Sequence, residues 1–404
     1  LEVNFPEIEG FVAFKFPKGE EGARMAAESI MEEVNKSSYV TQAALDVYLS
    51  GRMTIGHLSH LIGDNIVDLW TRLTTHKDLS LRCSHGGEDE RQQALALLEN
   101  RPKLVVDVVS LLTLHSIGAV DQIVKLYGRI GVAQSTIDVL SDILHKRELI
   151  NPHGYETIAK ENEHIIRQEV TEESIKNSIE KLESLIKWIR AECDILPVTE
   201  SLQTERAYVK ERGKLLGEEN IDTVLISKSP GHVLLSDDFL LRVIAKTELG
   251  IEGVWTQILL LHSFQNQGLE RSEYDSVVVS LIELGYRHIT IDSGVLTYSA
   301  QKAEWLPNEP FIAVSQRLNG YESKTDSAIA VAVNFFLELS NQPIMSIRRD
   351  TIISQILNCL VEGRRILPTI RTLVAVIQHR FKFNPIAADE YISTIAAWQS
   401  NKIV

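Results

Sequence analysis

The sequence predicts an α/β fold in which a parallel sheet flanked by helices lies between mainly helical N- and C-terminal regions. From Lys103 onward, short β-branched apolar runs alternate with segments of helical period, which is the order of a parallel sheet covered on both faces. Outside this stretch the apolar residues recur every three or four positions, as in amphipathic helices. We therefore predict three regions: a mixed, mostly helical 1–101, a sheet domain at 102–300 with a helical insertion at 145–220, and a helical 301–404.

Composition restricts the class of protein. The chain of 404 residues is 44% hydrophobic and 24% charged, as in ordinary folded proteins, and is long enough for two or three domains. No uninterrupted apolar span or signal peptide is visible, so we expect no membrane partner. Three widely spaced cysteines without metal-type spacing favour a reducing, cytoplasmic setting. The sequence starts at Leu1 rather than Met, which is typical of a processed product or of a piece of a longer protein.

In the N-terminal region, "FVAFKF" at 11–16 reads as a strand. Helical spacing then predicts helices at 22–34 and 57–73, and the second of these, "HLSHLIGDNIVDLWTRL", reads as one continuous helix. The polar stretch "CSHGGEDERQQ" at 83–93 reads as a loop before a short helix at 94–100. Its Cys83 and His85 could supply two metal ligands, but without a second pair a plain loop is the stronger interpretation.

Within the sheet domain six apolar runs read as strands. They are "KLVVDV" at 103–108, "GRIGVA" at 128–133, "CDILPV" at 193–198, "VLLS" at 233–236, "GVW" at 253–255 and "HITI" at 288–291. In the insertion, an apolar stripe along 174–192 predicts a helix that packs on the sheet; its members are Ile175, Ile179, Leu182, Leu185, Ile186 and Ile189. In the C-terminal region we expect helices to stop at "NQP" (341–343), "LP" (367–368) and "NP" (384–385).

Charge is distributed unevenly along the chain. The formal net charge of −14 argues against a protein that coats nucleic acid by bulk electrostatics. Residues 341–404 nevertheless carry eight Lys or Arg and four Asp or Glu, a balance of +4, which leaves −18 for the rest. This basic balance predicts either a local surface for a polyanion or ordinary solvated helix faces.

Acidic residues follow several of the predicted strands. In "LLSDDFLLR" (234–242), Ser236 or Asp237 is placed to cap the next helix, and Asp238 suits the positive end of its dipole. Asp107 lies inside an apolar run, where a carboxylate is costly unless it is paired or lies at the open end of a sheet. Ser110 is better placed than Asp107 to cap the helix that follows.

Two further segments could join these acids. Asp138 and Asp142 lie four residues apart and share one face of the helix that begins near Ser135, so both could point toward the sheet, although only one is needed. Thr256, at the turn after "GVW", could hold a water or cap a helix. Carboxylates at the carboxyl ends of neighbouring strands repel one another until a divalent cation enters. With Mg²⁺ or Mn²⁺ such a site can orient a water and stabilise charge on a phosphodiester. Motifs for an aspartyl-phosphate phosphatase or a nucleotide-binding glycine loop are absent from the sequence.

At these residues the chain resembles the PIN-domain ribonucleases. The resemblance runs from Pro102 to Ala300, through "KLVVDVVSLLTLHSIGAVDQI", "RIGVAQSTIDVL", "VLLSDDFLLRVIAKTELGIEGVWTQILL" and "GLERSEYDSVVVSLIELGYRHITI". It is closest to the bacterial branch found alongside tetratricopeptide repeats and a domain like the carboxyl end of transcript-cleavage factors. The resemblance implies metal ligands at Asp107, at Asp138 or alternatively Asp142, and at Asp237, with Asp238 assisting, Thr256 at the fourth position and Ser110 as a supporting hydroxyl. Many members have Glu at the second position, and the family includes members without catalysis.

The leading hypothesis from sequence is a Mg²⁺- or Mn²⁺-dependent endoribonuclease, or a related single-strand nuclease, that uses Asp107, Asp138, Asp237, Asp238 and Thr256. Arg242 and Lys228 are candidates for contacts with single-stranded RNA. The alternative is an interaction or regulatory module, with weak or no catalysis, of a larger bacterial defence protein. A hydrolase of small nucleotides is a third hypothesis. The expected partners are RNA and either a second copy or further domains of a longer chain.

Overall fold

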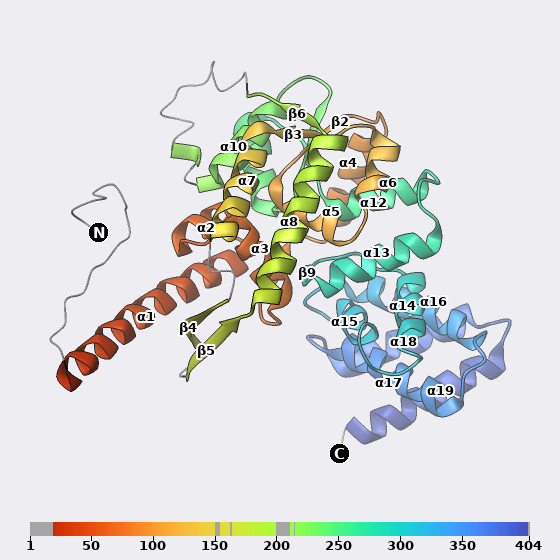
Figure 1. The fold of residues 1–404 in the computed structure, drawn as a ribbon. Helices are drawn as coiled ribbons and strands as arrows, with labels where there is room; N and C mark the ends of the chain where they lie inside the picture. Colours follow the sequence, from red (N-terminus) through yellow and green to blue (C-terminus); the bar gives the residue numbers. More distant parts are fainter. Residues whose placement is uncertain (1–18, 150–153, 162–163, 199–210, 214, 403–404) are drawn as a thin grey trace.

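The structure, a computed structural model, describes residues 19–149, 154–161, 164–198, 211–213 and 215–402. In Figure 1 the long helix α1 (Glu20–Leu49) extends away from the central sheet and its helices, and the C-terminal helices gather on the opposite side. The predicted strand at 11–16 lies outside the described residues. The predicted class is confirmed, since a five-stranded parallel sheet is flanked by helices.

The central sheet has the strand order β6-β3-β2-β7-β8, with every neighbouring pair parallel. Its strands are β2 (Lys103–Val106), β3 (Gly131–Ala133), β6 (Asp194–Leu196), β7 (His232–Leu235) and β8 (Gly253–Val254). β2 and β7 pair in register from Lys103 with His232 to Val106 with Leu235. Because the two strands end together, the residues that follow them meet at one edge of the sheet.

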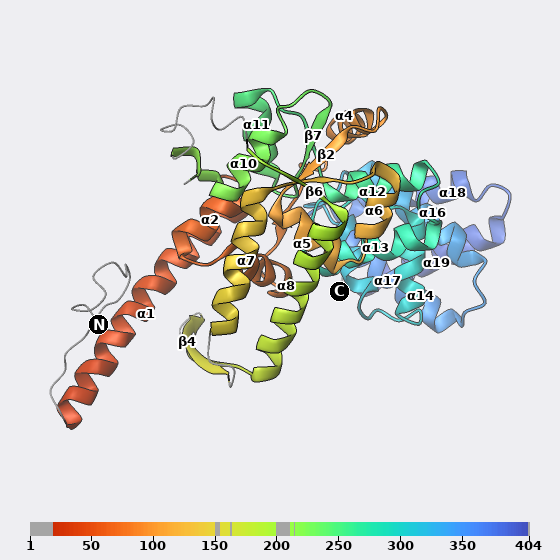
Figure 2. The ribbon, with the colours of Figure 1, turned by 45° about the horizontal axis from the view of Figure 1, so that its top comes forward.

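Both faces of this sheet are covered, which explains why its strands are apolar throughout rather than alternating. Val105 and Leu234 belong to small apolar clusters formed with α10 (Glu218–Ile226) and α11 (Phe239–Leu249). Leu104, Val106 and Leu235 join the main core on the other face. The helices next to the sheet also include α5 (Val108–Ser116), α6 (Val120–Tyr127), α7 (Gln134–Leu149), α8 (Glu172–Glu192), α12 (Thr256–Gln265) and α13 (Arg271–Glu283). In Figure 2, α7 and α8 run side by side, and α6 lies beside α12.

Two predictions for the N-terminal region were wrong. The helix predicted at 57–73 is two helices, α2 (Ile55–Ile62) and α3 (Ile66–Thr75), because Gly63 takes a left-handed conformation that ends α2 and Asn65 caps α3. The loop predicted at 83–93 ends early, since α4 (Glu88–Leu98) starts at its acidic residues, which suit a helix N-terminus. The short strand β1 (Leu81–Arg82) pairs in parallel with β9 (Tyr286–Arg287) and ties this region to the segment after α13.

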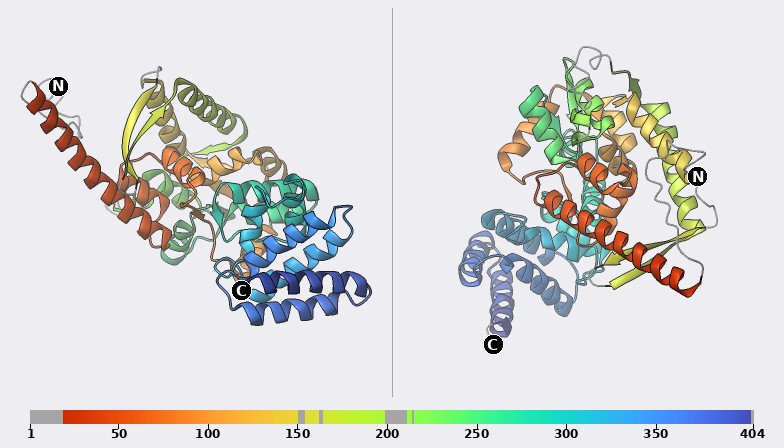
Figure 3. Two further views of the ribbon diagram at one scale, coloured as in Figure 1. Left: turned by 90° about the horizontal axis from the view of Figure 1, so that it is seen from below. Right: turned by 90° about the vertical axis from the view of Figure 1, so that its left-hand side faces the viewer.

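The insertion was predicted to be helical, and this was wrong in part. It contains an antiparallel hairpin of β4 (Tyr155–Glu161) and β5 (His164–Val170), whose β-branched residues favour strands. The strand predicted at 193–198 is confirmed as β6. The hairpin lies beside α1 (Figure 3). The predicted stripe is confirmed in α8 for Ile175, Leu182, Leu185, Ile186 and Ile189, which are buried, while its sixth member, Ile179, is half-buried. The strand predicted at 288–291 was also wrong, because the strand there is β9, two residues earlier.

The C-terminal region is helical, as predicted. Its helices are α14 (Ser293–Lys302), α15 (Phe311–Ser315), the 3₁₀ turn η2 (Gln316–Leu318), α16 (Thr325–Ser340), α17 (Ser346–Val361), α18 (Ile366–Arg380) and α19 (Pro385–Lys402). The stops at "NQP" and "NP" fall where helices end or begin. The stop at "LP" was wrong: Pro368 lies in the first turn of α18, where a missing N–H breaks no helical hydrogen bond.

The main cluster of buried apolar residues runs from Ala44 to Trp398 and therefore does not separate the three predicted regions. Their division stays a prediction. In the described part of the chain no single helix is long and apolar enough to cross a membrane; only the bent pair α5 and α6 reaches that length and composition together.

Candidate active site

Asp107 follows β2 directly and caps α5. Its Oδ1 accepts a hydrogen bond of 2.7 Å from the N–H of Ser110, and its Oδ2 accepts one of 2.5 Å from the hydroxyl of Ser236. The expectation that Ser110 would be the cap was wrong, because α5 begins at Val108, inside the apolar run. A buried carboxylate is tolerated here because both of its oxygens have hydrogen-bond donors.

Asp237 follows β7 by two residues and reaches the start of α12. Its Oδ1 accepts a hydrogen bond of 2.8 Å from the N–H of Thr256. Its Oδ2 accepts hydrogen bonds from the hydroxyl of Thr256 at 2.7 Å and from that of Tyr286 at 2.9 Å. The N-cap of α12 is Trp255, so the suggestion that Thr256 caps this helix was wrong. Three donors on one carboxylate fix its orientation.

Asp238 joins the starts of two helices that are far apart in the sequence. Its Oδ1 accepts a hydrogen bond of 3.1 Å from the N–H of Leu241 and caps α11. Ser236 and Asp237, the caps predicted from sequence, do not cap this helix. Oδ2 of Asp238 accepts a hydrogen bond of 2.6 Å from the N–H of Ile55, the first residue of α2. The positive ends of both helix dipoles therefore stabilise the Asp238 carboxylate.

Two serine hydroxyls connect Asp107 to the Asp237–Asp238 pair. Ser236 donates to Asp107 and accepts a hydrogen bond of 3.1 Å from the N–H of Asp238. The hydroxyl of Ser110 accepts one of 2.8 Å from the N–H of Asp237. The resemblance implied a supporting hydroxyl at Ser110, and the structure places Ser110 between the first acid and the late acids.

Burial governs the ionisation of these acids. Asp107, Ser110, Ser236, Asp237 and Thr256 are each 0% exposed. Burial raises the pKa of Asp107 to about 7, although hydrogen bonds from Ser236 and Ser110 oppose the rise. Burial also raises the pKa of Asp237, against the donors on Thr256 and Tyr286. Burial raises the pKa of Asp238 as well. The site thus favours protonated carboxyls more than water does.

Arg242 supplies positive charge beside this site. Its guanidinium donates to the carbonyls of Ser236 and Cys83, each at 2.6 Å, and lies 3.4 Å from Glu90 Oε1. It also lies 4.9 Å from the ring centroid of Trp255. Burial lowers the pKa of Arg242, while the surrounding acids raise it. Arg242 is only 6% exposed, so in this conformation it connects elements of the fold and does not face solvent.

The second acid predicted from sequence lies in a different environment. Asp138 is exposed on the second turn of α7, where its Oδ1 accepts a hydrogen bond of 2.8 Å from Gln134 Nε2. Asp142 is exposed one turn later, and Lys228 is exposed after α10. The structure therefore brings Asp107, Asp237, Asp238 and Thr256 into one hydrogen-bonded network, whereas it places Asp138 and Asp142 on the surface.

The acids offer oxygen atoms of the kind that bind a divalent cation. Carboxylates and hydroxyls are the oxygen donors that Mg²⁺ and Mn²⁺ prefer. Across the described residues, however, no group of three His, Cys, Asp or Glu side chains is arranged to hold a metal ion. Every carboxylate oxygen of Asp107 and Asp237 already accepts a protein hydrogen bond. In this conformation the acids do not fit a metal, and Cys83 with His85 forms no metal group either.

The N-terminal region packs directly against the acidic edge. Besides the bond from Ile55 to Asp238, the hydroxyl of Thr54 donates to the carbonyl of Leu215 at 2.7 Å. Gly56 lies so close to the segment before α10 that an added Cβ would fall 1.9 Å from the carbonyl oxygen of Leu216. Such a close approach requires glycine. The start of α2 is therefore fixed against the edge that carries the acids.

Sequence reasoning missed two partners of the acids. Tyr286 lies in "ELGYRH", which carries no catalytic motif, and only its place at a strand could have pointed to it. The N–H of Ile55 is a backbone group, for which side-chain patterns give no signal.

The family model described as the PIN domain associated with the TPR-GreAB-C-PIN system matches residues 105–247. The match includes Asp107, Asp138, Asp237 and Asp238, but it ends before Thr256 and is shorter than the resemblance from Pro102 to Ala300. No curated protein and no solved structure matches the chain.

Proposed function

Because residues 105–247 match the family model of a PIN domain, we propose that this protein is a nuclease, an endoribonuclease that cleaves single-stranded RNA in the presence of Mg²⁺ or Mn²⁺. The observation that carries the proposal is the convergence of Asp107 and Asp237 at the carboxyl ends of adjacent parallel strands. This is the edge at which open α/β sheets bind ligands. A reducing cytoplasm, in which the buried free cysteines stay reduced, is the proposed location.

The acids themselves suggest how the chain would contribute to hydrolysis. A carboxyl with a pKa of about 7, as at Asp107, can accept or donate a proton near neutral pH, which suits general acid–base work. Thr256 and Tyr286 would hold Asp237 in one orientation. In the family, a divalent cation is typically required, but in this conformation the oxygens of the acids are occupied by protein donors.

We therefore regard the structure as a closed state. RNA would reach Asp107 and Asp237 only after the edge beside α2 opens, since both acids are 0% exposed. Asp138 and Asp142, exposed on α7, stay the two proposals for the second acid.

A second candidate function is favoured by the same closure. The oxygens of the acids accept hydrogen bonds from α2, α5, α11 and α12. The role of the network would then be to hold these helices together, without catalysis. The chain would then be an interaction or regulatory module of a larger bacterial defence protein. Its partners would be further domains of a longer chain or a second copy.

Cleavage of labelled single-stranded RNA separates the two candidates. The purified protein is incubated with Mg²⁺ or Mn²⁺ beside an Asp107→Asn/Asp237→Asn double variant, and single-stranded DNA is run in parallel. Asn retains an oxygen that can cap α5 and accept from Thr256, so the variant is expected to stay folded. The matched control is Asp89→Asn, which removes an exposed carboxylate on α4.

We expect cleavage that chelator abolishes, that the double variant loses by at least about a hundredfold, and that Asp89→Asn retains. Equal cleavage by the double variant would remove the acid pair from the proposal. Absence of cleavage with either metal would favour the interaction module. Single variants at Asp138 and Asp142 then identify the second acid, because only the one that contributes should lower the rate.

A further inference from the structure

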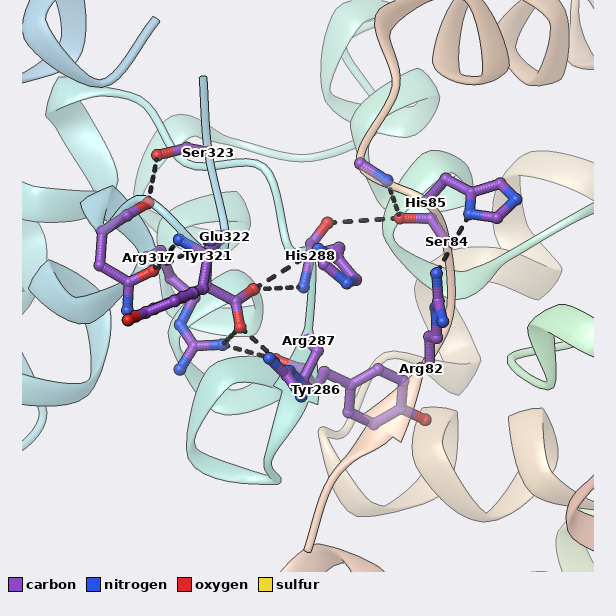
Figure 4. Close-up of polar contacts among 12 residues, drawn as sticks. Arg82, Ser84, His85, Tyr286, Arg287, His288, Arg317, Tyr321, Glu322 and Ser323 are labelled. Carbon is purple, nitrogen blue, oxygen red and sulfur yellow. Dashed lines mark hydrogen bonds and ion pairs between the residues drawn. The ribbon is translucent and has the colours of Figure 1, made fainter. Parts of the chain in front are cut away.

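A second polar cluster lies where β1 meets β9, apart from the acidic edge (Figure 4). A cavity of about 180 Å³ opens there between the end of α1, β1 and β9. Its lining residues are Tyr48, Leu49, Ser80, Arg82, Arg287 and His288. Nothing in the proposed nuclease chemistry uses these side chains.

The register of the two strands places positive charges side by side. Arg82 pairs directly with Arg287 across the parallel ladder, so their side chains leave the same face. Like charges at paired positions are destabilising unless something compensates them. Arg317 adds a third guanidinium, 3.5 Å from Glu322 Oε1.

One carboxylate serves this group of cations. Glu322, with a side chain only 6% exposed, accepts a hydrogen bond of 3.1 Å from Arg287 Nε and one of 2.8 Å from the N–H of His288. Figure 4 shows Glu322 between His288 and the Arg287–Arg317 pair, while Arg82 points toward His85. Two guanidinium groups, those of Arg287 and Arg317, therefore share a single acid, and Arg82 has no part in it.

Arg82 is the least compensated of the three. It forms no ion pair with any carboxylate of the described residues, and its Nε is buried without a hydrogen-bond partner. Its Nη2 lies 3.2 Å from Nδ1 of His85, and its guanidinium lies 5.4 Å from the ring centroid of Phe239. A buried donor without an acceptor is costly, which indicates that the cluster lacks an anion.

Tyr48, which lines the same cavity, gives an independent indication. It is 5% exposed, and its hydroxyl lies beside the backbone of Arg82 without completing a hydrogen bond. The cavity is thus lined by an unpartnered hydroxyl as well as by an uncompensated guanidinium.

The backbone at His288 is also unusual. Its φ of 60° is left-handed, a conformation that side chains other than glycine adopt at a cost and that concentrates at functional sites. Burial lowers the pKa of His288, so its ring is mainly neutral at pH 7 and can donate one hydrogen bond.

We propose that this cavity is a binding site for a phosphate group, held by Arg82 and Arg287 and by the hydroxyl of Tyr48. Guanidinium forks match phosphate oxygens in two-point contacts, and the small volume suits a terminal phosphate better than an internal phosphodiester. The choice of RNA as the carrier of this phosphate rests on the proposed function; the phosphate site itself does not.

The site lies next to the acids along the chain. Tyr286, which donates to Asp237, directly precedes Arg287, and side chains alternate across a strand. Phe239, beneath Arg82, directly follows Asp238. A phosphorylated strand end held in the cavity would therefore be anchored on the opposite side of β9 from Asp237.

Binding is measured in chelator, so that cleavage plays no part. Fluorescence anisotropy compares a single-stranded RNA carrying a 5′-phosphate with the same RNA carrying a 5′-hydroxyl, and inorganic phosphate is added as a competitor. We expect the phosphorylated RNA to bind about tenfold more tightly, as charge-assisted contacts to one phosphate provide.

Two variants and one control complete the test. Tyr48→Phe removes only an unpartnered hydroxyl and should leave the fold intact, yet it should weaken phosphate binding several-fold. Arg82→Gln should abolish the preference. Arg371→Gln, which removes an exposed arginine on α18, should change nothing.

Equal binding of the two RNAs, together with direct binding of inorganic phosphate in calorimetry that Arg82→Gln weakens, would support the site and assign it to a small phosphorylated molecule. The proposed phosphate site would be overturned if neither the phosphorylated RNA nor inorganic phosphate bound preferentially. It would also be overturned if Arg371→Gln lost as much binding as Arg82→Gln. Phosphate binding by a protein that cleaves no RNA would leave this site standing while the proposed nuclease function fails.

Discussion

The hydroxyl of Ser236 donates a hydrogen bond of 2.5 Å to the carboxylate of Asp107, and both residues are 0% exposed. The two residues belong to neighbouring strand ends that are 129 positions apart in the chain. This bond stabilises the ionised form of Asp107, whereas burial opposes it. Burial prevails, since the pKa of Asp107 is raised to about 7.

The first prediction concerns stability and pH. Because the pKa of Asp107 is higher in the folded protein than its ordinary 3.8, the folded state binds more protons between about pH 4 and 7. The stabilisation of the folded state that comes from this raised pKa is therefore fully present below about pH 4 and is lost as the pH rises through about 7. Asp107→Asn should reduce the fall in unfolding free energy between pH 5 and 8 by on the order of 2 kcal/mol, measured by urea denaturation. An unchanged fall would contradict the raised pKa.

The second prediction concerns the bond between the serine and the acid. Ser236→Ala leaves one buried oxygen of Asp107 without its donor and should lower the unfolding free energy by about 1–3 kcal/mol. Ser227→Ala is the matched control, because Ser227 is also buried but donates only to the carbonyl of Thr223 in α10, the helix that it follows. Denaturation of both variants at pH 8 compares them. Equal losses would mean that Ser236 matters only as a filler of space.

The third prediction concerns the attachment of α2 to the acidic edge. Asp238→Ala removes the cap of α11 and the acceptor for the N–H of Ile55, so it should cost about 1–2 kcal/mol and expose α2. Hydrogen exchange at the N–H of Ile55 should accelerate in Asp238→Ala relative to the unchanged protein, because the Oδ2 that accepts its hydrogen bond is gone. If exchange at Ile55 is equally slow in the variant and in the unchanged protein, α2 is held by other contacts.

The sheet could be predicted from sequence because its signal is local. Strands buried on both faces are continuous apolar runs, and the acids after them were recognised by their places in those runs. Capping could not be assigned, because Ser110 and Asp107 are equally good cap residues and only the position of Val108, already helical, decides between them.

Long-range partners were beyond sequence reasoning for a physical reason. Tyr286 reaches Asp237 across 49 positions, and Ile55 reaches Asp238 across 183, through contacts that depend on packing and not on spacing. The exposure of Asp138 could not be predicted for the same reason. The spacing shows that Asp138 and Asp142 share one helix face, but the direction of that face depends on packing. The hairpin β4–β5 was missed because its strands pair with each other outside the main sheet and so lack its apolar pattern.

The last prediction tests whether Tyr286 acts on an acid. Tyr286→Phe removes a donor from Asp237 and a partner from Thr113, and should cost about 1–2 kcal/mol. Because that donor holds the pKa of Asp237 down against burial, its loss should raise this pKa further, so the destabilisation should be larger at pH 8 than at pH 5. Tyr391→Phe is the control: its hydroxyl contacts Ser340 and the carbonyl of Phe336 but no carboxylate, so its cost should not depend on pH. Equal pH dependence in the two variants would show that Tyr286 fills space beside Asp237 without controlling its charge.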